Sequence, residues 1–132
     1  MSQENVTFIQ GLYKAFEQGD IPTFLAAMNP NIEWYEPQAQ DYPAGGLHRG
    51  PQAVANEVFS PVPTYYEEFA AVPQDFVDAG DRVIVLGEFR GKGKARGISF
   101  VAPFVHIYTI HNGKLTRMQN YTDTGTMAAA IK

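Results

Sequence analysis

The sequence predicts an α+β fold, in which three helices pack on one face of a bent, mixed but mostly antiparallel sheet. Two observations support this prediction. Segments with helical spacing dominate the chain before Pro61, whereas four apolar runs rich in β-branched and aromatic residues follow it. The runs are Phe69–Val77, Arg82–Arg90, Ile98–Ile110 and Lys114–Thr122. Helices on one face of such a sheet form a cone with an open end, which can hold a ligand.

Three stretches have the spacing and the end signals of helices. The first ends at Gly19, and the second is short, with Asp20 as its N-cap and Pro30 just beyond its end. The third begins near Pro51, because proline is well tolerated at the first helical position, and extends to Phe59. The apolar residues that define the first helix are Val6, Ile9, Tyr13 and Phe16.

The segments around the third helix are predicted from breakers and alternation. Ile32–Glu36 alternates like a strand until Pro37 interrupts it. Pro43–Gly46 and His48–Gly50 are expected to be loops, with ligand contact or gating as an alternative role for His48. Asp123, after the last strand, is expected to cap a C-terminal turn or helix.

His106 interrupts the long apolar run, and the turn after that run decides which residues lie beside it. If His111–Gly113 is a three-residue loop, His106 lies opposite Met118. A two-residue turn would instead shift the pairing by one residue. In the first case, alternation places hydrogen-bonding groups among apolar ones on one face, a mixture typical of a small-molecule site. That face carries Phe104, His106, Tyr108, Met118 and Asn120.

The composition argues against several classes of protein. The chain has 132 residues, of which 45% are hydrophobic, so we expect a single folded domain over residues 1–132. A net charge of −4 argues against a nucleic-acid partner. The N-terminus lacks a leader pattern, and no apolar run reaches the roughly 18 residues that cross a membrane, so we expect a cytoplasmic protein with no membrane partner.

Neither a metal nor a cofactor is expected. The chain has no cysteine, which excludes disulfides and thiolate ligands. The three histidines, His48, His106 and His111, lack the spacing of a metal site. Any chemistry must therefore come from ordinary side chains.

Several motifs together resemble the nuclear-transport-factor-2-like (NTF2-like, cystatin-like) superfamily. They are Phe16-x-x-Gly19-Asp20, Ile32-Glu33-Trp34-x-Glu36-Pro37, Gly50-Pro51-x-Ala53-Val54, Gly80-Asp81-Arg82-Val83 and Gly113-Lys114-Leu115. Within the superfamily the chain is similar to the SnoaL-like proteins, relatives of polyketide cyclases and ketosteroid isomerase. The resemblance covers essentially the whole chain and implies the cone-shaped fold. It says less about function, because this fold hosts many activities.

The resemblance to ketosteroid isomerase implies roles for three residues. The general base of that enzyme precedes a proline at the end of the first strand, where this chain has Glu36. Its two oxyanion donors correspond to Tyr13 and, in place of an aspartic acid, His106. Polyketide cyclases also carry a histidine at the position of His106, but their catalytic aspartate corresponds to Asn120 here.

We therefore expect a cofactor-free enzyme that transfers a proton on a small apolar carbonyl or polycyclic compound. Glu36 would be the base, and His106 and Tyr13 the acid or oxyanion donors. Trp34 shares a strand face with Glu36 and is expected to raise the pKa of the carboxyl by desolvation. The residues expected to contact the substrate are Trp34, Phe104, Tyr108, Met118 and Asn120.

Other interpretations of the same residues stay open. His106 and Tyr13 fit equally well as buried core residues with satisfied hydrogen bonds, and Glu36 fits as an exposed residue at a strand end. The cone would then be a non-catalytic module for a hydrophobic ligand, or a dimeric interaction protein whose cavity is filled by its own side chains.

An apolar stripe on the outer face of the sheet predicts a homodimer. It consists of Val101, Val105, Ile107 and Thr109. Soluble monomers seldom leave a large apolar patch exposed.

Overall fold

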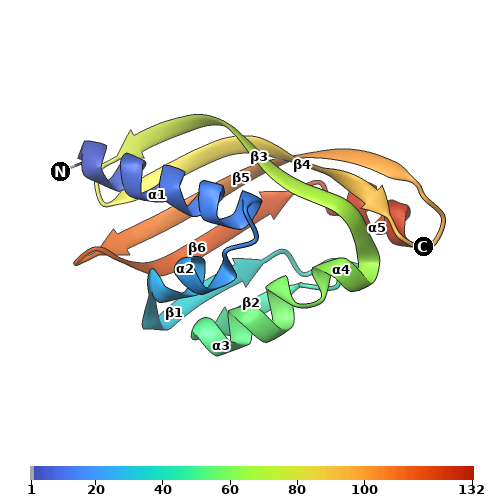
Figure 1. Cartoon of the computed structure of the whole chain (residues 1–132), viewed down its shortest axis with the longest axis horizontal. Coiled ribbons are helices and arrows are strands. Elements are labelled where there is room, and N and C mark those ends of the chain that lie inside the picture. The colour runs from blue at the N-terminus through green and yellow to red at the C-terminus, as the bar shows by residue number, and fades with distance from the viewer. Residues whose placement is uncertain (1) are drawn as a thin grey trace.

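The computed structural model describes residues 2–132 and confirms the predicted α+β fold (Figure 1). Its helices are α1 (Ser2–Glu17), α2 (Ile21–Ala26), α3 (Pro51–Val54), the π-helix η1 (Ala55–Phe59), α4 (Val62–Tyr65) and α5 (Thr124–Ile131). Its strands are β1 (Met28–Glu36), β2 (Gly46–Arg49), β3 (Tyr66–Ala79), β4 (Arg82–Gly93), β5 (Ser99–His111) and β6 (Lys114–Thr122). No helix in this range is long and apolar enough to cross a bilayer.

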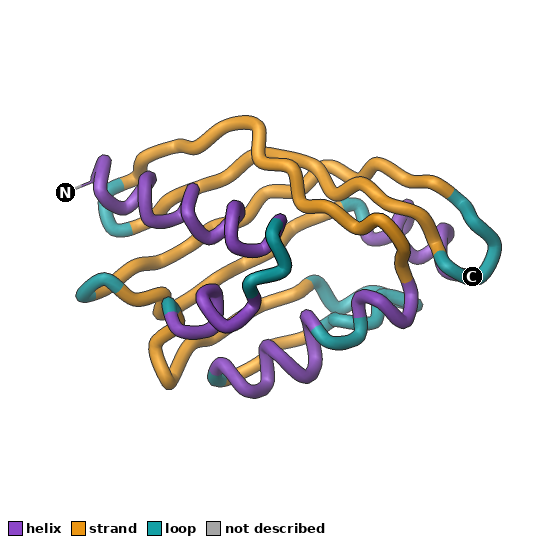
Figure 2. The backbone as a smooth tube through the Cα atoms, in the orientation of Figure 1, coloured by secondary structure: helices purple, strands orange, loops and turns teal. Residues whose placement is uncertain are grey.

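The strands of the described chain form one mixed sheet in the order β2-β1-β6-β5-β4-β3. Strands β1 and β6 are parallel, and the other neighbouring pairs are antiparallel. The β1–β6 pairing joins distant parts of the sequence and brings Trp34 next to Met118. The turns between strands lie at the two ends of the sheet (Figure 2). Between them, the strands present one continuous inner face beneath the helices.

The predicted apolar face of the first helix is buried against this inner face, with α1 lying across β3 and β4 (Figure 1). Ile9 of α1, Ile32 of β1 and Leu115 of β6 are fully buried together in the core. Helix α2 begins as predicted after Asp20, whose carboxylate accepts a hydrogen bond from the backbone N–H of Thr23 at 3.3 Å. These contacts fix the helical layer over the sheet.

The predicted register of the β5–β6 hairpin is wrong, although the predicted inward face is correct. Asn112 and Gly113 have φ angles of 50° and 73° and form a two-residue turn, not a three-residue loop. A bulge close to the turn then adds one residue to β6. The two one-residue shifts add, so alternation is restored. His106 therefore lies opposite Asn120, not opposite Met118.

The loop predicted at His48–Gly50 is also wrong, because residues 46–49 form the edge strand β2. It pairs antiparallel with β1, with His48 beside Trp34. A strand of four residues between Gly46 and Gly50 is too short for alternation to reveal it.

The segment predicted as the third helix begins at Pro51 as expected but changes character after one turn. Only Pro51–Val54 is α-helical, and Ala55–Phe59 is a π-helix, a rare form often found at functional sites. At the other end of the chain, Asp123 accepts a hydrogen bond from the backbone N–H of Thr126 at 3.0 Å. The predicted cap is thereby confirmed, and the helix that it begins is α5.

Candidate active site

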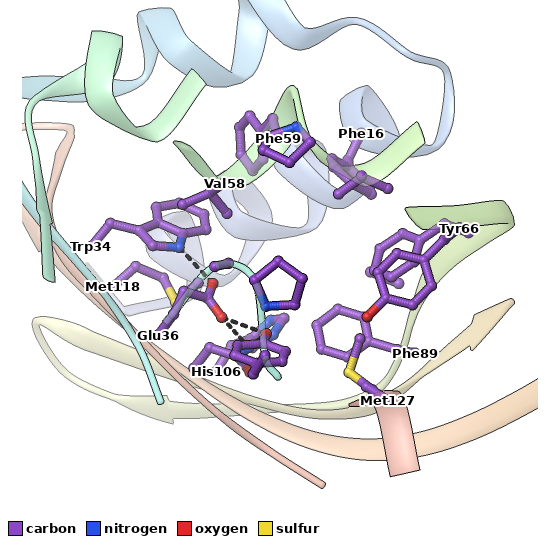
Figure 3. A pocket seen from close by; sticks show the side chains of 18 of the residues that line it. Phe16, Trp34, Glu36, Val58, Phe59, Tyr66, Phe89, His106, Met118 and Met127 are labelled. Carbon is purple, nitrogen blue, oxygen red and sulfur yellow. Dashed lines mark hydrogen bonds between the residues drawn. The ribbon is translucent and has the colours of Figure 1, made fainter. Parts of the chain in front are cut away.

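A cavity of about 90 Å³ lies between the inner face of the sheet and the helices. Most of its wall is aromatic or aliphatic. In Figure 3, Phe16, Val58 and Phe59 approach it from one side, and Trp34, Glu36, Met118 and His106 lie together on another. A largely apolar cavity with a few gathered polar groups is the usual form of a small-molecule site.

Glu36 is the only carboxylate on this wall within the described chain, and both of its oxygens are hydrogen-bonded. Trp34, two residues earlier on the same face of β1, donates from Nε1 to Oε2 at 2.8 Å. Asn120 of β6 and Tyr42 of the loop after β1 both donate to Oε1, at 2.8 and 2.7 Å. The side chain is 3% exposed. We call Glu36, Trp34, Tyr42 and Asn120 the carboxylate cluster.

Burial raises the pKa of Glu36, because removal from water disfavours the charged form. The hydrogen bonds from Asn120, Trp34 and Tyr42 oppose this effect and lower the pKa. The expected influence of Trp34 therefore needs correction. Its ring helps to bury the carboxyl, but its N–H stabilises the carboxylate directly, since a donor to the charged form favours that form.

His106 is held from one side by two tyrosines. Its Nδ1 lies 2.6 Å from the hydroxyl of Tyr13, and the hydroxyl of Tyr108 donates to that of Tyr13 at 3.1 Å. Since Tyr13 accepts from Tyr108, its own proton points at Nδ1. The proton of a neutral His106 then resides on Nε2. We call these three residues the imidazole cluster.

Burial keeps the imidazole cluster uncharged. It lowers the pKa of His106 to about 3, and a hydrogen bond with the side chain of Asn120 opposes the shift. It also raises the pKa of Tyr13 and Tyr108 well above the ordinary tyrosine value. Phe104 stacks on the imidazole with ring centres 3.7 Å apart. At neutral pH this cluster therefore presents a neutral N–H donor rather than a cation.

The structure brings seven of the eight predicted site residues to the cavity wall. These are Tyr13, Trp34, Glu36, His106, Tyr108, Met118 and Asn120. Phe104 is absent from the wall and instead packs against the imidazole. Sequence reasoning missed Tyr42 and Tyr66. Tyr42 lies in an irregular loop and Tyr66 starts a strand, and neither position carries a periodic signal.

His48 has a structural environment outside the cavity wall. Its Nδ1 lies 2.6 Å from Oε1 of Glu57 and its Nε2 lies 2.6 Å from the carbonyl oxygen of Ala44. The carboxylate of Glu57 and the carbonyl of Ala44 are both acceptors, so a protonated ring nitrogen of His48 can donate to either of them. His48 thereby ties the loop after β1 to η1, and its charge lowers the pKa of Glu36 slightly.

No group of three or more histidine, aspartate or glutamate side chains among residues 2–132 is arranged to hold a metal ion. The polar side-chain groups on the cavity wall are one carboxyl, one imidazole, one amide, one indole N–H and several phenols. These groups are suited to moving protons and to donating hydrogen bonds.

The chain is similar to known protein families and solved structures. The family model described as SnoaL-like domain matches residues 9–118. No curated protein matches the chain. An NTF2-like protein of unknown function from Burkholderia pseudomallei K96243 is 31% identical over 100% of this chain and 99% of that one, with a TM-score of 0.90.

Two further solved structures extend the comparison. TerC, co-crystallised with polyporic acid, is 32% identical over 96% of this chain and 97% of its own, with a TM-score of 0.87. A protein from Catenulispora acidiphila with a ketosteroid-isomerase-like fold, in complex with trimethylamine, is 14% identical over 94% of this chain and 91% of its own, with a TM-score of 0.76, and shows the shared fold alone. On the match to the family model and the two relatives above 30% identity, the chain belongs to the SnoaL-like family of NTF2-like proteins.

Proposed function

We propose that this protein binds a small, largely apolar carbonyl compound in the cavity and transfers a proton at the carbon next to the carbonyl. The observation that carries the proposal is one pair of groups on one wall. A buried carboxylate with a raised pKa lies beside a buried imidazole whose Nε2 has no partner. Abstraction of such a proton needs a base and a hydrogen-bond donor for the developing enolate oxygen.

The hydrogen bonds of Glu36 indicate which oxygen would act. Oε1 already accepts from both Tyr42 and Asn120, whereas Oε2 accepts only from Trp34. A carboxylate oxygen accepts about two hydrogen bonds, so Oε2 keeps one free lone pair. In the proposed step the α-proton moves to Oε2, its bonding electrons form the enolate, and the enolate oxygen accepts from His106 Nε2–H. Return of a proton to carbon completes the cycle.

The size of the cavity limits the ligand. An engineered cavity of about 150 Å³ holds benzene, so the 90 Å³ found here suits a compound of similar or smaller size with modest adjustment of the wall. TerC was co-crystallised with polyporic acid. A larger ligand would require the wall to move further, and η1, which supplies Val58 and Phe59, is the irregular segment beside it.

A binding module without catalysis is the second candidate, and the three donors on Glu36 favour it. They stabilise the carboxylate and therefore weaken it as a base. Binding and proton transfer can be tested separately, because Trp34 is the single tryptophan of the chain and lies on the cavity wall. Its fluorescence reports occupancy, and NMR in D₂O reports exchange of the α-protons of a ketone.

The decisive experiment compares Glu36→Gln with the wild type, using cyclohexanone as the probe. We expect affinity within a few-fold of wild type and loss of enzyme-dependent α-proton exchange, because the amide keeps the shape but not the basicity. Glu33→Gln is the matched control, since Glu33 lies on the same strand but pairs with Arg49 on the surface. Equal exchange in wild type and Glu36→Gln would reject Glu36 as the base and leave the binding module as the supported candidate. If neither cyclohexanone nor polyporic acid binds, both candidates are rejected.

We also propose that a second copy of the chain covers the outer face of the sheet. The predicted stripe has Val101 55% exposed, and neighbouring strands add Leu86 and Tyr121, which are 40% and 43% exposed. Leu86 and Tyr121 both pair with Val105, so the patch is continuous across three strands. We expect light scattering at micromolar concentration to give a dimer, and Leu86→Glu to give a monomer with an unchanged cavity. A wild-type monomer would contradict the proposal.

A further inference from the structure

The unpaired polar atoms of the molecule converge on the cavity. Among residues 3–132, three buried side-chain nitrogen or oxygen atoms have no hydrogen-bond partner. They are His106 Nε2, Asn120 Oδ1 and the hydroxyl of Tyr66, and all three residues line the cavity. Buried polar groups in native proteins are paired in the great majority of cases. His106 Nε2–H and Asn120 Oδ1 are a donor and an acceptor on directly paired residues, and a hydrogen bond with Asn120 raises the pKa of His106, so these two atoms can serve each other. The Tyr66 hydroxyl has no such complement among the described residues, which indicates that an occupant of the cavity supplies its partner.

The three atoms lie on two sides of the cavity. His106 and Asn120 are directly paired across β5 and β6, so their free atoms form one polar end beside Glu36. Tyr66 is the first residue of β3 and stands on the other side of the cavity from Trp34 and Glu36 (Figure 3). An occupant that bonds at both ends would carry two polar functions separated by an apolar body.

The hydroxyl of Tyr66 is fixed in this position by packing. The residue is 7% exposed, and its ring centre lies 5.3 Å from those of Phe69 and Phe100. Burial raises the pKa of Tyr66 to about 12, so the phenol stays protonated. It is a neutral donor that cannot easily turn toward bulk water.

The geometry points to Tyr66 as a second polar contact that selects ligands with an oxygen function at each end. This inference rests on the proposed function and names its substrate class: a compact apolar ring compound with a carbonyl at the Glu36 end and a neutral acceptor, such as a second carbonyl, at the Tyr66 end. The far group is neutral because no lysine or arginine lines the described cavity wall. A carboxylate there would be buried without a counter-ion.

Matched ligand pairs test the inference. Cyclohexanone and 1,4-cyclohexanedione share one ring and differ by the second carbonyl, and acetophenone and 1,4-diacetylbenzene make a longer pair. In each pair, the two-ended member is the diketone and the one-ended member is the monoketone. For at least one pair we expect the wild type to bind the diketone more than twofold more tightly, since twofold is the statistical advantage of two equivalent carbonyls. Tyr66→Phe should weaken that member by about 3- to 10-fold, the typical contribution of one hydrogen bond, and leave the one-ended member unchanged. Trp34 fluorescence measures both affinities.

A control and a second measurement keep the result interpretable. Tyr35→Phe makes the same chemical change on the outer face, where Tyr35 contacts Tyr121, and should leave all affinities unchanged. Tyr66→Phe should also keep or raise the melting temperature of the ligand-free protein, because it deletes an unpaired buried hydroxyl. If one-ended ketones bind but Tyr66→Phe changes neither two-ended affinity, the inference is overturned while the proposed function stands. If no ketone binds, both fail.

Discussion

The two clusters on the cavity wall differ in how completely their polar atoms are paired. In the carboxylate cluster, Glu36 has donors on both oxygens from three elements of the fold. In the imidazole cluster, His106 is bonded at Nδ1 but not at Nε2. Asn120 combines the two cases, because its amide nitrogen donates to Glu36 while its amide oxygen has no hydrogen-bond partner.

The difference reflects the charge of each group: the carboxylate of Glu36 is stabilised by donors on both oxygens, whereas the imidazole of His106 is neutral. Burial shifts the buried carboxyl of Glu36 toward its neutral form, and the three donors oppose that shift by stabilising the charged form. A neutral imidazole needs only enough support to fix its tautomer, and the two tyrosines provide that. In the proposed function, the Nε2–H of His106 is the group that donates to the ligand. The following variants test this contrast, in order of decreasing effect.

Two replacements of His106 should separate its two nitrogens. His106→Asn can keep an acceptor for Tyr13 but removes the Nε2–H donor, so we expect α-proton exchange to fall about 100- to 1,000-fold, as for a lost oxyanion donor. His106→Gln places an amide nearer the position of Nε2 and should retain more of the exchange. Exchange by NMR and folding by circular dichroism are the measurements. If both variants unfold, His106 has a structural role; equal exchange in both folded variants would contradict the assignment of the donor.

The low pKa of His106 predicts a loss of stability in acid. Below pH 6.5 His106 is protonated in the unfolded chain, whereas in the folded chain it is protonated only below about pH 3. The free energy of unfolding therefore falls as the pH decreases through this window. Glu36, with its raised pKa, acts in the opposite direction, but it is present in both proteins compared. Between pH 6.5 and 4.5, the wild type should lose about 2 to 3 kcal/mol more than His106→Asn.

Urea unfolding followed by Trp34 fluorescence measures this difference. His111→Asn, which changes an exposed histidine at the end of β5, is the matched control and should keep the wild-type loss. A wild type and a His106→Asn variant with parallel pH profiles would show that folding does not lower the pKa of His106.

Removing one tyrosine hydroxyl from each cluster should have smaller and different effects. Tyr42→Phe deletes a donor to Glu36, so the pKa of Glu36 should rise further and the pH midpoint of exchange should move upward by about one unit. Tyr108→Phe deletes the neutral bond to Tyr13 and should cost about 1 kcal/mol of stability without moving the midpoint. The pH–rate profiles of the two variants decide, and a shared midpoint would contradict the separation into two clusters.

Local signals predicted the residues that lie on regular elements. The alternation around Trp34 and Glu36, and the odd polar residue in the run around His106, follow from period-two patterns that survive in the fold. The register could not be obtained this way, because the turn and the bulge each shift it by one residue and their errors combine.

The remaining contacts depend on tertiary structure. Tyr42 reaches Glu36 from an irregular loop after Asp41, whose φ is +63°, and no sequence period links the two. Tyr66 is notable only because its hydroxyl lacks a partner, which is a property of the packed protein. The strand β2 is too short to show alternation. Periodic patterns thus predicted the strand residues of the cavity wall, whereas the contacts of Tyr42 and Tyr66 follow only from the folded chain.

The parallel pairing of β1 with β6 has a consequence for how the protein folds. Glu36 and Asn120, which share a hydrogen bond, are 84 positions apart in the chain. Contacts between distant positions close large loops and slow folding, so an intermediate built from the adjacent β3, β4 and β5 strands would lack this bond. During synthesis the carboxylate stays without its amide donor until β6 has left the ribosome. Competence to bind the ligand and completion of the topology are therefore expected to arrive in the same step, and no earlier species can compete for the ligand.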